Sequence, residues 1–189
     1  MAESTIIVEV GRLEDLGYRR LGILGSGGFG EVEEVINTTT QDRFAHKKLL
    51  VRRRDLAQTL EVFRREIRII RRLQDHHHFI KLQQAYQTND SLGMLIYPVA
   101  DSGSLEDYMA NSAQTTVLKN AVGCLAEGLE HMHTVRRVRH KDIKPGNVLI
   151  HQGLVLFSDL GLSQDFSKLS RDITNGPHRY WTPKYATPE

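Results

Sequence analysis

The sequence has little of several features that would place a chain outside the ordinary globular class. Its 189 residues include a single cysteine, Cys124, which excludes an internal disulfide and fits a reducing compartment. The first five residues lack the basic start and long apolar core of a secretory signal. No apolar run approaches the roughly 20 residues that a membrane-spanning helix needs. We therefore expect an intracellular, cytoplasmic protein without a membrane partner.

An excess of charge of one sign is also missing. The 25 Lys and Arg residues face 23 Asp and Glu residues, for a formal net charge of +2. This balance argues against nucleic acid as a partner, and the basic run 52–54 fits a solvated helix or loop. With 40% hydrophobic and 25% charged residues, the chain is typical of a globular protein that forms one ordinary domain or two small lobes.

A β-hairpin is predicted near the C-terminal end. Apolar residues 148–150 and 154–157 flank the segment 151–153, whose sequence His-Gln-Gly puts a glycine in the turn. Folding the chain about this turn brings Asn147 close to Ser158. The residues that precede and follow the hairpin should therefore meet at its open end.

Candidate catalytic and metal-binding side chains gather at that open end. Asp159 follows Ser158, so its carboxylate should lie beside the Asn147 amide. An amide oxygen and a carboxylate side by side suit a hard cation such as Mg²⁺, which prefers oxygen ligands. Asp142 and Lys144 lie just upstream, as a candidate base and a candidate phosphate-binding group. The alternative is a charged turn between two strands.

A glycine motif occupies residues 25–32, where Gly-Ser-Gly-Gly-Phe-Gly-Glu-Val fits Gly-x-Gly-x-x-Gly-x-Val. Dinucleotide-binding folds use this glycine spacing too, but there a helix follows the glycines. Here the β-prone residues 31–36 lead into the turn-forming run 37–40, which indicates strand, loop and strand. Such a loop can bring backbone N–H groups to a phosphate, because glycine removes the side chains that would block approach. The alternative is a flexible hairpin turn.

Residues 42–50 are predicted to form a third strand. Side chains alternate along a strand, so Ala45 and Lys47 should share one face, while Phe44, His46 and Lys48 share the other. The run Ala-His-Lys at 45–47 resembles the Val-Ala-x-Lys strand of protein kinases, which implies that Lys47 holds phosphates. Lys48 is the rival for that role, and the small residue two positions before Lys47 favours Lys47.

An amphipathic helix is predicted over residues 56–73, with an apolar stripe made of Leu60, Phe63, Ile67, Ile70 and Leu73. Glu66 falls on or beside this stripe, where a carboxylate is costly unless it is paired. Lys47 is the expected partner. The alternative is a surface charge that pairs with the neighbouring Arg64 or Arg65.

The run Asp75-His76-His77-His78-Phe79 suggests a metal site, which we set aside on sequence grounds. Adjacent histidines should splay their side chains apart, and no cysteine or acidic cluster completes a site. Further elements are strands over 80–82 and 92–99, a helix capped by Ser104, and a long helix over 115–133. The inward residues expected on the long helix are Leu118, Ala121, Val122, Leu125, Leu129 and Met132.

Together these motifs resemble the catalytic domain of eukaryotic-type protein kinases. Residues 140–147, His-Lys-Asp-Ile-Lys-Pro-Gly-Asn, with Asp-Leu-Gly at 159–161, resemble its catalytic loop and metal-binding segment. The Lys-Pro after the aspartate is similar to the serine/threonine branch. The resemblance implies an α+β, two-lobed protein-kinase-like fold, with an antiparallel β N-lobe carrying one long helix and a partial, mostly helical C-lobe. The implied division is an N-terminal extension over 1–17, the N-lobe over 18–99, and the partial C-lobe over 100–189, from the hinge to the activation segment.

The same resemblance implies an activity and its residues. The chain would be a protein serine/threonine kinase that transfers the γ-phosphate of Mg·ATP to Ser or Thr hydroxyls of a protein substrate; the alternative is an ATP-binding pseudokinase or scaffold. Asp142 would be the base, and Lys144 would contact the γ-phosphate. Lys47, fixed by Glu66, would hold the α- and β-phosphates. Asn147 and Asp159 would hold Mg²⁺. The implied nucleotide-binding residues are Leu24, Gly25, Gly27, Gly30, Val32, Ala45, Lys47, Tyr97, Pro98, Ala100 and Leu149.

Within that nucleotide set, Tyr97 would lie at the back of the adenine pocket. The Pro98 carbonyl and the Ala100 N–H would bond the adenine ring. The segment after Gly161 resembles an activation segment, with Ser163, Ser167, Ser170 and Thr174 as candidate phosphorylation sites and Thr182 as a partner of Asp142.

Three departures from the family pattern stand out. They are Lys141 for Arg, Leu160 for Phe and Thr187 for Ala. Lysine lacks the forked donor geometry of arginine, which puts control by a phosphorylated activation loop in doubt. Because further helices follow this point in the family, we expect the chain to be a piece of a longer protein.

Overall fold

The computed structural model describes residues 7–27, 30–111 and 115–167. Predictions that concern Gly28 and Phe29 of the glycine motif, or Ser170, Thr174, Thr182 and Thr187 of the C-terminal segment, lie outside the described residues. The chain divides into two compact units. The first unit comprises Met1–Arg71 and Ile80–Val99, and the second comprises Arg72–Phe79 and Ala100–Glu189. Each unit is described by itself.

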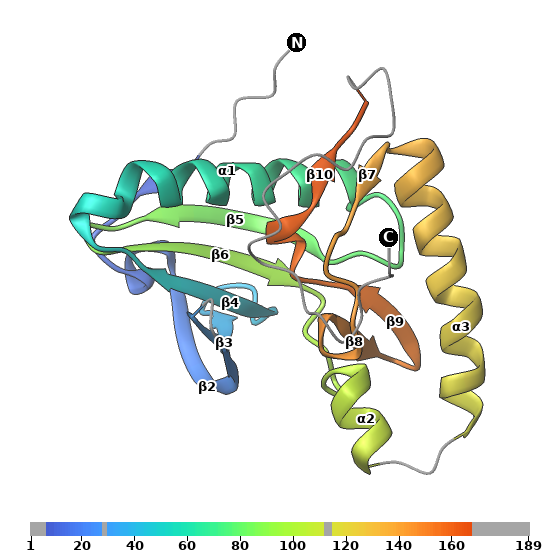
Figure 1. The fold of residues 1–189 in the computed structure, drawn as a ribbon. Helices are drawn as coiled ribbons and strands as arrows, with labels where there is room; N and C mark the ends of the chain where they lie inside the picture. Colours follow the sequence, from blue (N-terminus) through green and yellow to red (C-terminus); the bar gives the residue numbers. More distant parts are fainter. Residues whose placement is uncertain (1–6, 28–29, 112–114, 168–189) are drawn as a thin grey trace. The chain divides into compact units, whose positions relative to one another are not determined.

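A six-stranded sheet in the order β1-β5-β6-β4-β3-β2 forms the first unit (Figure 1). Neighbouring strands are antiparallel, except that β1 runs parallel to β5. The sheet therefore includes residues from the predicted N-terminal extension, where Val8 pairs with Tyr86. The strands are β1 (Val8–Glu9), β2 (Tyr18–Gly27), β3 (Gly30–Asn37), β4 (Arg43–Leu50), β5 (Lys81–Gln87) and β6 (Ser91–Tyr97).

One long helix, α1 (Leu56–Leu73), lies along the sheet of this unit (Figure 1). Its bounds are those that the apolar stripe predicts, and the short 3₁₀ turn η2 (Arg53–Asp55) leads into it. The stripe faces inward: Leu60 is partly buried, and Phe63, Ile67, Ile70 and Leu73 are buried. Glu66 is buried among them, so the sequence prediction that it lies on or beside the stripe is confirmed.

The sheet of the first unit also carries an apolar cluster. It joins β2, β3, β4, β5 and β6 to the 3₁₀ turn η1 (Leu13–Leu16), and its buried members are Leu13, Tyr18, Val35, Phe44, Tyr86 and Leu95. Phe44 belongs to this cluster, and β-strand alternation then puts Lys47 on the other face of β4. We call the face with Phe44 the outer face and the face with Lys47 the inner face.

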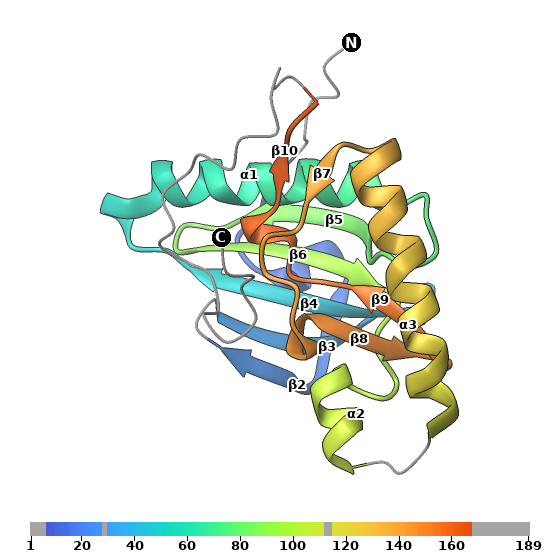
Figure 2. The ribbon, with the colours of Figure 1, turned by 45° about the vertical axis from the view of Figure 1, so that its right-hand side comes forward.

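The second unit combines helices with short strand pairs (Figure 2). The α-helices among its described residues are α2 (Leu105–Asn111) and α3 (Thr115–Glu130), and α3 continues as the π-helical turn η3 (His131–Val135). The hairpin strands are β8 (Val148–His151) and β9 (Leu154–Phe157), and β7 (Val138–Arg139) pairs with β10 (Gln164–Asp165). The 3₁₀ turns η4 (Pro145–Asn147) and η5 (Leu160–Leu162) border the hairpin.

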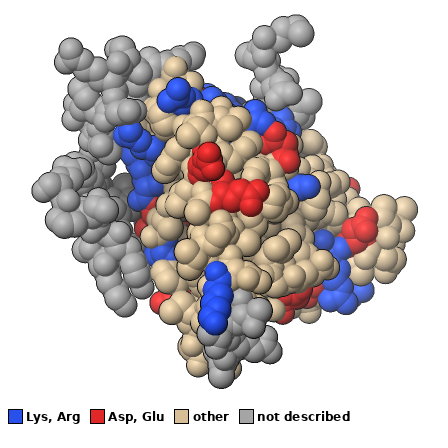
Figure 3. Space-filling view, turned by 90° about the vertical axis from the view of Figure 1, so that its right-hand side faces the viewer, with Lys and Arg blue, Asp and Glu red and all other residues tan. Residues whose placement is uncertain are grey.

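Helix α3 packs on the hairpin, in a core that includes Leu105, Ala121, Val148, Ile150 and Val155. The prediction that Val122 points inward is wrong, because its side chain is 70% exposed. Val122 lies about 100° around the helix from Ala121, which already faces the hairpin. On the face of the molecule shown in Figure 3, acidic and basic side chains are scattered among uncharged ones. None of the helices in the described part of the chain combines the length and apolar character that crossing a bilayer demands.

Candidate active site

Lys47 in the first unit is paired with the helix glutamate. The Lys47 Nζ lies 2.8 Å from Glu66 Oε1, and the two side chains are 13% and 7% exposed. The predicted ion pair is therefore present, and it explains how a carboxylate can be buried on the apolar stripe of α1. Its rival Lys48 belongs to the outer face by alternation, and there it lines a pocket with Arg20 and Glu33.

The inner face around Lys47 is made of small and apolar side chains. Lys47 is opposite Val32 on one neighbouring strand and Met94 on the other, and Ala45 is opposite Ile96. Directly opposed residues of an antiparallel pair share a face. Val32, Ala45, Met94 and Ile96 therefore surround the lysine, and Ile96 is a residue that sequence reasoning missed.

Tyr97 is not on this face, which corrects the prediction that it lies at the back of an adenine pocket beside Ala45. Since Ile96 shares the inner face with Ala45, the next residue of the strand points to the outer face. There the Tyr97 ring meets the Phe44 ring edge-on, with centroids 6.0 Å apart. Ile96, which is 8% exposed, takes the inner position.

The glycine motif lies on the hairpin of β2 and β3. Gly27 is opposite Gly30, and Gly25 is opposite Val32. Gly30 has a φ of 122°, and a Cβ atom there would lie 2.2 Å from the Lys48 carbonyl oxygen. Only glycine fits both the backbone angle and the close contact with β4. Leu24, also predicted to contact nucleotide, is 45% exposed on β2.

Asp142 in the second unit is held by the two side chains predicted to work with it. Its Oδ2 accepts hydrogen bonds of 2.8 Å from Lys144 Nζ and of 2.8 Å from Asn147 Nδ2. The Asn147 amide nitrogen also donates to the Asp142 backbone carbonyl at 2.8 Å. The loop thus fixes the orientation of a carboxylate that is 6% exposed. Because the nitrogen of Asn147 is directed to Asp142, its oxygen is the end suited to a cation.

A buried histidine supports this loop from behind. His140 Nε2 donates to the Ser158 carbonyl at 2.9 Å, and His140 Nδ1 accepts from the Asp142 N–H at 3.3 Å. One ring proton satisfies both bonds, so the neutral form is the one that fits. Burial lowers the pKa of His140 from the ordinary 6.5, which agrees with that form. Sequence reasoning quoted His140 in the motif but did not assign it this role, which depends on the distant Ser158.

The hairpin joins the loop to Asp159 as predicted. Gln152 and Gly153 at its tip have φ values of 51° and 76°, the pair of positive angles that a tight two-residue hairpin turn uses. At its open end, Ser158 donates from its N–H at 3.0 Å and from its hydroxyl at 2.9 Å to the Asn147 carbonyl. Asp159 follows directly, with a φ of 52° in the left-handed region that non-glycine residues adopt uncommonly.

The remaining predicted residues are placed as follows. Leu149 lies on β8, is partly buried and forms a bridge with Ser104. Pro98 and Ala100 are partly buried in their respective units. Ser163 is a poor phosphorylation site, because it is 1% exposed and its hydroxyl donates to the His140 carbonyl at 3.2 Å. Ser167, by contrast, is exposed.

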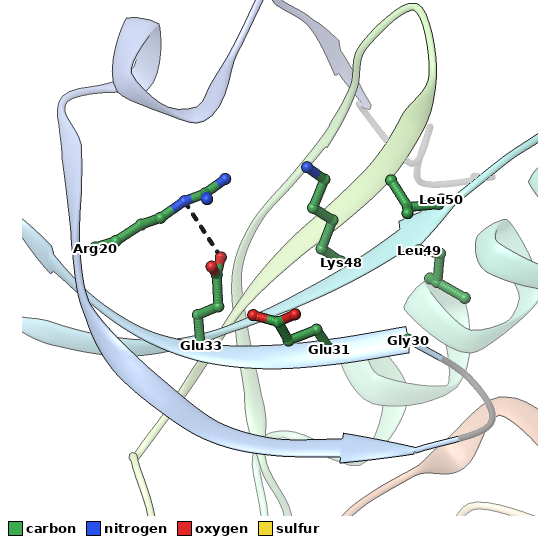
Figure 4. Close-up of a pocket in the computed structure, with 7 residues that line it drawn as sticks. All are labelled: Arg20, Gly30, Glu31, Glu33, Lys48, Leu49 and Leu50. Atoms are coloured by element: carbon green, nitrogen blue, oxygen red, sulfur yellow. Dashed lines mark ion pairs between the residues drawn. The ribbon is translucent and has the colours of Figure 1, made fainter.

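A second polar feature lies on the outer face of the sheet. Figure 4 shows a pocket of about 390 Å³, in which the Arg20 guanidinium pairs with Glu33 at 3.3 Å and Lys48 lies nearby. Behind Glu33, the fully buried His46 contacts Glu33 Oε2 at 3.0 Å and the Tyr86 hydroxyl at 2.7 Å. Burial is the main cause that lowers the pKa of His46, and burial raises the pKa of Tyr86 to about 12.

Comparison with known proteins identifies the family. A model of the protein kinase domain matches residues 18–189. The chain belongs to the protein kinase domain family. Beta-adrenergic receptor kinase 1 of Mesocricetus auratus is 31% identical over 167 residues, which are 86% of this chain and 24% of that protein. The serine/threonine-protein kinase STE7 homolog of Candida albicans is 28% identical over 168 residues, 85% of this chain and 28% of that protein.

The serine/threonine-protein kinase H1 homolog of Pinctada fucata is 26% identical over 183 residues, which are 91% of this chain and 40% of that protein. The chain therefore spans between about a quarter and two fifths of the length of these relatives.

The structure accommodates two of the departures from the kinase motifs. Leu160 is fully buried, as an apolar replacement of Phe requires, and Lys141 is exposed with a φ of 70°.

Proposed function

We propose that this kinase domain transfers the γ-phosphate of Mg·ATP to Ser or Thr hydroxyls of a protein substrate. The observation that carries the proposal is the buried Asp142 carboxylate, which Lys144 and Asn147 of the same loop hold in place. Phosphoryl transfer depends on positioning and charge stabilisation more than on covalent help from the protein. A carboxylate with a fixed orientation beside a lysine meets that need. The names of the relatives support the serine/threonine assignment.

Asp142 would accept the proton of the substrate hydroxyl as the new O–P bond forms. A general base of this kind typically contributes 10²–10⁴-fold, roughly, to a rate. Lys144 Nζ lies 2.8 Å from the same carboxylate, so it would contact the transferred phosphate close to the attacking oxygen. His140 would act through Asp142 as a positioning residue, because it holds the backbone of the loop rather than the substrate.

The residues present fit a magnesium ion. The Asn147 amide presents its oxygen, and Asp159 supplies a carboxylate from the end of the hairpin, which are the hard oxygen ligands that Mg²⁺ prefers. When bound, Mg²⁺ neutralises charge on the phosphates of ATP.

In the first unit, Lys47 would hold the α- and β-phosphates, with Glu66 fixing its direction. Gly25, Gly27 and Gly30 would let backbone N–H groups approach the phosphates. Val32, Ala45 and Ile96 would contact the adenine ring from the inner face, together with Leu24 and Leu149. The Pro98 carbonyl and the Ala100 N–H would bond its edge. We also propose an intracellular, cytoplasmic location on the sequence grounds given above.

The test replaces Asp142 by Asn in the full-length protein. Asp142→Asn keeps the shape of the side chain but removes its basicity, so phosphate transfer to a generic basic protein should fall by about 10²-fold or more. Binding of Mg·ATP, followed by thermal shift, should remain, because Lys47 and Asp159 are intact. Glu130→Gln, an exposed change on α3, is the matched control and should transfer phosphate at the wild-type rate.

Transfer by Asp142→Asn at the rate of the control would exclude Asp142 as the base. Nucleotide binding without transfer by the wild-type protein would instead support the alternative, an ATP-binding pseudokinase or scaffold.

A further inference from the structure

Three histidines of the second unit converge on one carboxylate outside the kinase site. His76 Nε2 and His77 Nε2 each lie 3.6 Å from Glu127 Oε1, and His78 Nε2 lies 3.6 Å from Glu127 Oε2. The histidines belong to the turn after α1, and Glu127 belongs to α3. Our expectation that adjacent histidines splay apart is therefore wrong here. His78 also bonds to the Val155 carbonyl through its other ring nitrogen, Nδ1.

The geometry of the cluster suits a small cation. One ligand atom each from His76, His77 and Glu127 can be chosen so that all three lie within 4.8 Å of one another. Zinc sites with two imidazole nitrogens, one carboxylate oxygen and an open fourth position are well known, with bonds of about 2.0–2.2 Å. Small side-chain rotations would bring three atoms at the observed separations to such distances.

His78 gives independent evidence for a cation. Its side chain is 1% exposed, and its Nδ1 lies 2.9 Å from the Val155 carbonyl. A carbonyl only accepts, so Nδ1 carries the proton and Nε2 of the neutral ring presents a lone pair. This buried Nε2 has no hydrogen-bond partner among the described residues, and it faces the Glu127 carboxylate. Two electron-rich groups in contact are stable only if a positive charge or a proton lies with them.

A further contact bears on the ligand His76. Its Nδ1 accepts a hydrogen bond from the His78 N–H at 3.3 Å. A metal on Nε2 would move the ring proton to Nδ1 and end this long, weak contact.

We propose that His76, His77 and Glu127 bind a divalent transition metal of the zinc type, with His78 beside the second oxygen of Glu127. Nitrogen ligands favour Zn²⁺ over Mg²⁺ or Ca²⁺, which prefer oxygen. The bound ion would tie the turn 75–79 to α3 within the second unit.

The test measures binding of Zn²⁺ alone to the full-length protein by calorimetry, with excess Mg²⁺ present to occupy the oxygen ligands of the kinase site. We expect one equivalent of Zn²⁺ to bind, and saturation to raise Tm by roughly 5–10 °C. With Co²⁺ as the probe, the visible absorption of a four-coordinate ion should appear.

His77→Ala and Glu127→Gln should each weaken Zn²⁺ binding by at least about 10-fold and lower the Co²⁺ absorption. Both side chains are more than half exposed, so these changes leave the core intact. His133→Ala and Glu130→Gln, exposed residues of the same chain segment, are the matched controls and should bind Zn²⁺ as the wild type does.

Failure of Zn²⁺ to bind, or binding that the His77 and Glu127 variants leave unchanged, would overturn the proposal. So would the finding by NMR that a proton on His78 Nε2 persists when Zn²⁺ is added, because the contact with Glu127 is then an ordinary ion pair. None of these measurements depends on phosphate transfer, so they stand apart from the test of kinase activity.

Discussion

His46 shows at the scale of one residue how burial makes stability depend on pH. The ring is fully buried between Glu33 and the Tyr86 hydroxyl, with the Arg20 and Lys48 cations on the same side of the sheet. Burial lowers its pKa, and the hydrogen bond to Glu33 opposes this effect only in part. Tyr86 stays protonated because burial raises its pKa to about 12. Neutral His46 can therefore donate to Glu33 and accept from Tyr86.

The sign of the pH effect follows from this lowered pKa. In the unfolded chain His46 takes up a proton near pH 6.5, whereas in the folded chain it does so only at lower pH. Below pH 6.5 the unfolded state thus binds more protons, and the free energy of unfolding falls. We expect urea unfolding to show full stability above that pH and a loss as the pH falls through the lowered pKa. In His46→Gln the free energy of unfolding should fall less steeply with decreasing pH, because the contribution of His46 is lost while that of His140 remains.

If the free energy of unfolding fell with decreasing pH equally in His46→Gln and in the wild type, His46 would not be a source of the pH dependence. His46→Gln should also cost about 1–3 kcal/mol at pH 8, since Glu33 and Tyr86 lose a well-placed partner.

Single residues were predictable where one strand or helix decides their direction. Alternation along β4 separated Lys47 from Lys48, and helical spacing put Glu66 on the buried stripe. The prediction for Tyr97 was wrong, because the resemblance identified a position in the chain, whereas the pairing of β6 with β4 decides which face of the sheet that residue occupies. The prediction that the side chains of histidines 76–78 point apart was wrong for a similar reason. Adjacent side chains splay in an extended strand but not in a turn.

At the scale of the element, α3 offers a matched pair of glycines. A Cβ atom added at Gly123 would meet nothing within 4 Å, whereas one at Gly128 would lie 2.5 Å from Phe157 Cε2. Phe157 cannot move aside easily, because it is fully buried and its ring stacks on Phe79 at 5.2 Å. Both glycines cost helix propensity, but only Gly128 allows the close approach of α3 to β9.

We therefore expect opposite effects of the same substitution. Gly123→Ala should stabilise the protein by about 0.5–1 kcal/mol, because alanine is the better helix former. Gly128→Ala should destabilise it by about 1–3 kcal/mol through overpacking against Phe157. Urea unfolding followed by circular dichroism measures both. A stabilising Gly128→Ala would show that α3 does not approach the hairpin as closely as the structure has it.

Elements were predictable where periodicity is strong and local. The apolar stripe gave both ends of α1, and the capping box of α2 is present, with Ser104 Oγ accepting from the Asp107 N–H at 3.1 Å. Strand β5 was predicted only over 80–82, yet it extends to Gln87. Its later residues are mostly polar and carry no alternation, so their strand conformation depends on pairing with β6.

At the scale of the whole molecule, the proposed function assigns one nucleotide to residues of both units. Lys47 and Glu66 belong to the first unit, and Asp142, Asn147 and Asp159 belong to the second. The sequence predicted these residues through their motifs. The structure pairs Lys47 with Glu66 in the first unit, and in the second it holds Asp142 with Lys144 and Asn147. A solution experiment tests this assignment.

Amide hydrogen exchange with and without Mg·ATP is that experiment. If one nucleotide uses both sets of residues, Mg·ATP should slow exchange in β2, β3 and β4 and also in residues 140–159. Lys47→Met should reduce the protection in both segments, because losing the phosphate contact in one unit weakens the binding that protects the other. Lys48→Met, one residue along β4 but on the outer face, should leave both protections in place. Protection confined to one unit, or equal loss in the two lysine variants, would mean that the residues of the two units do not serve the same nucleotide.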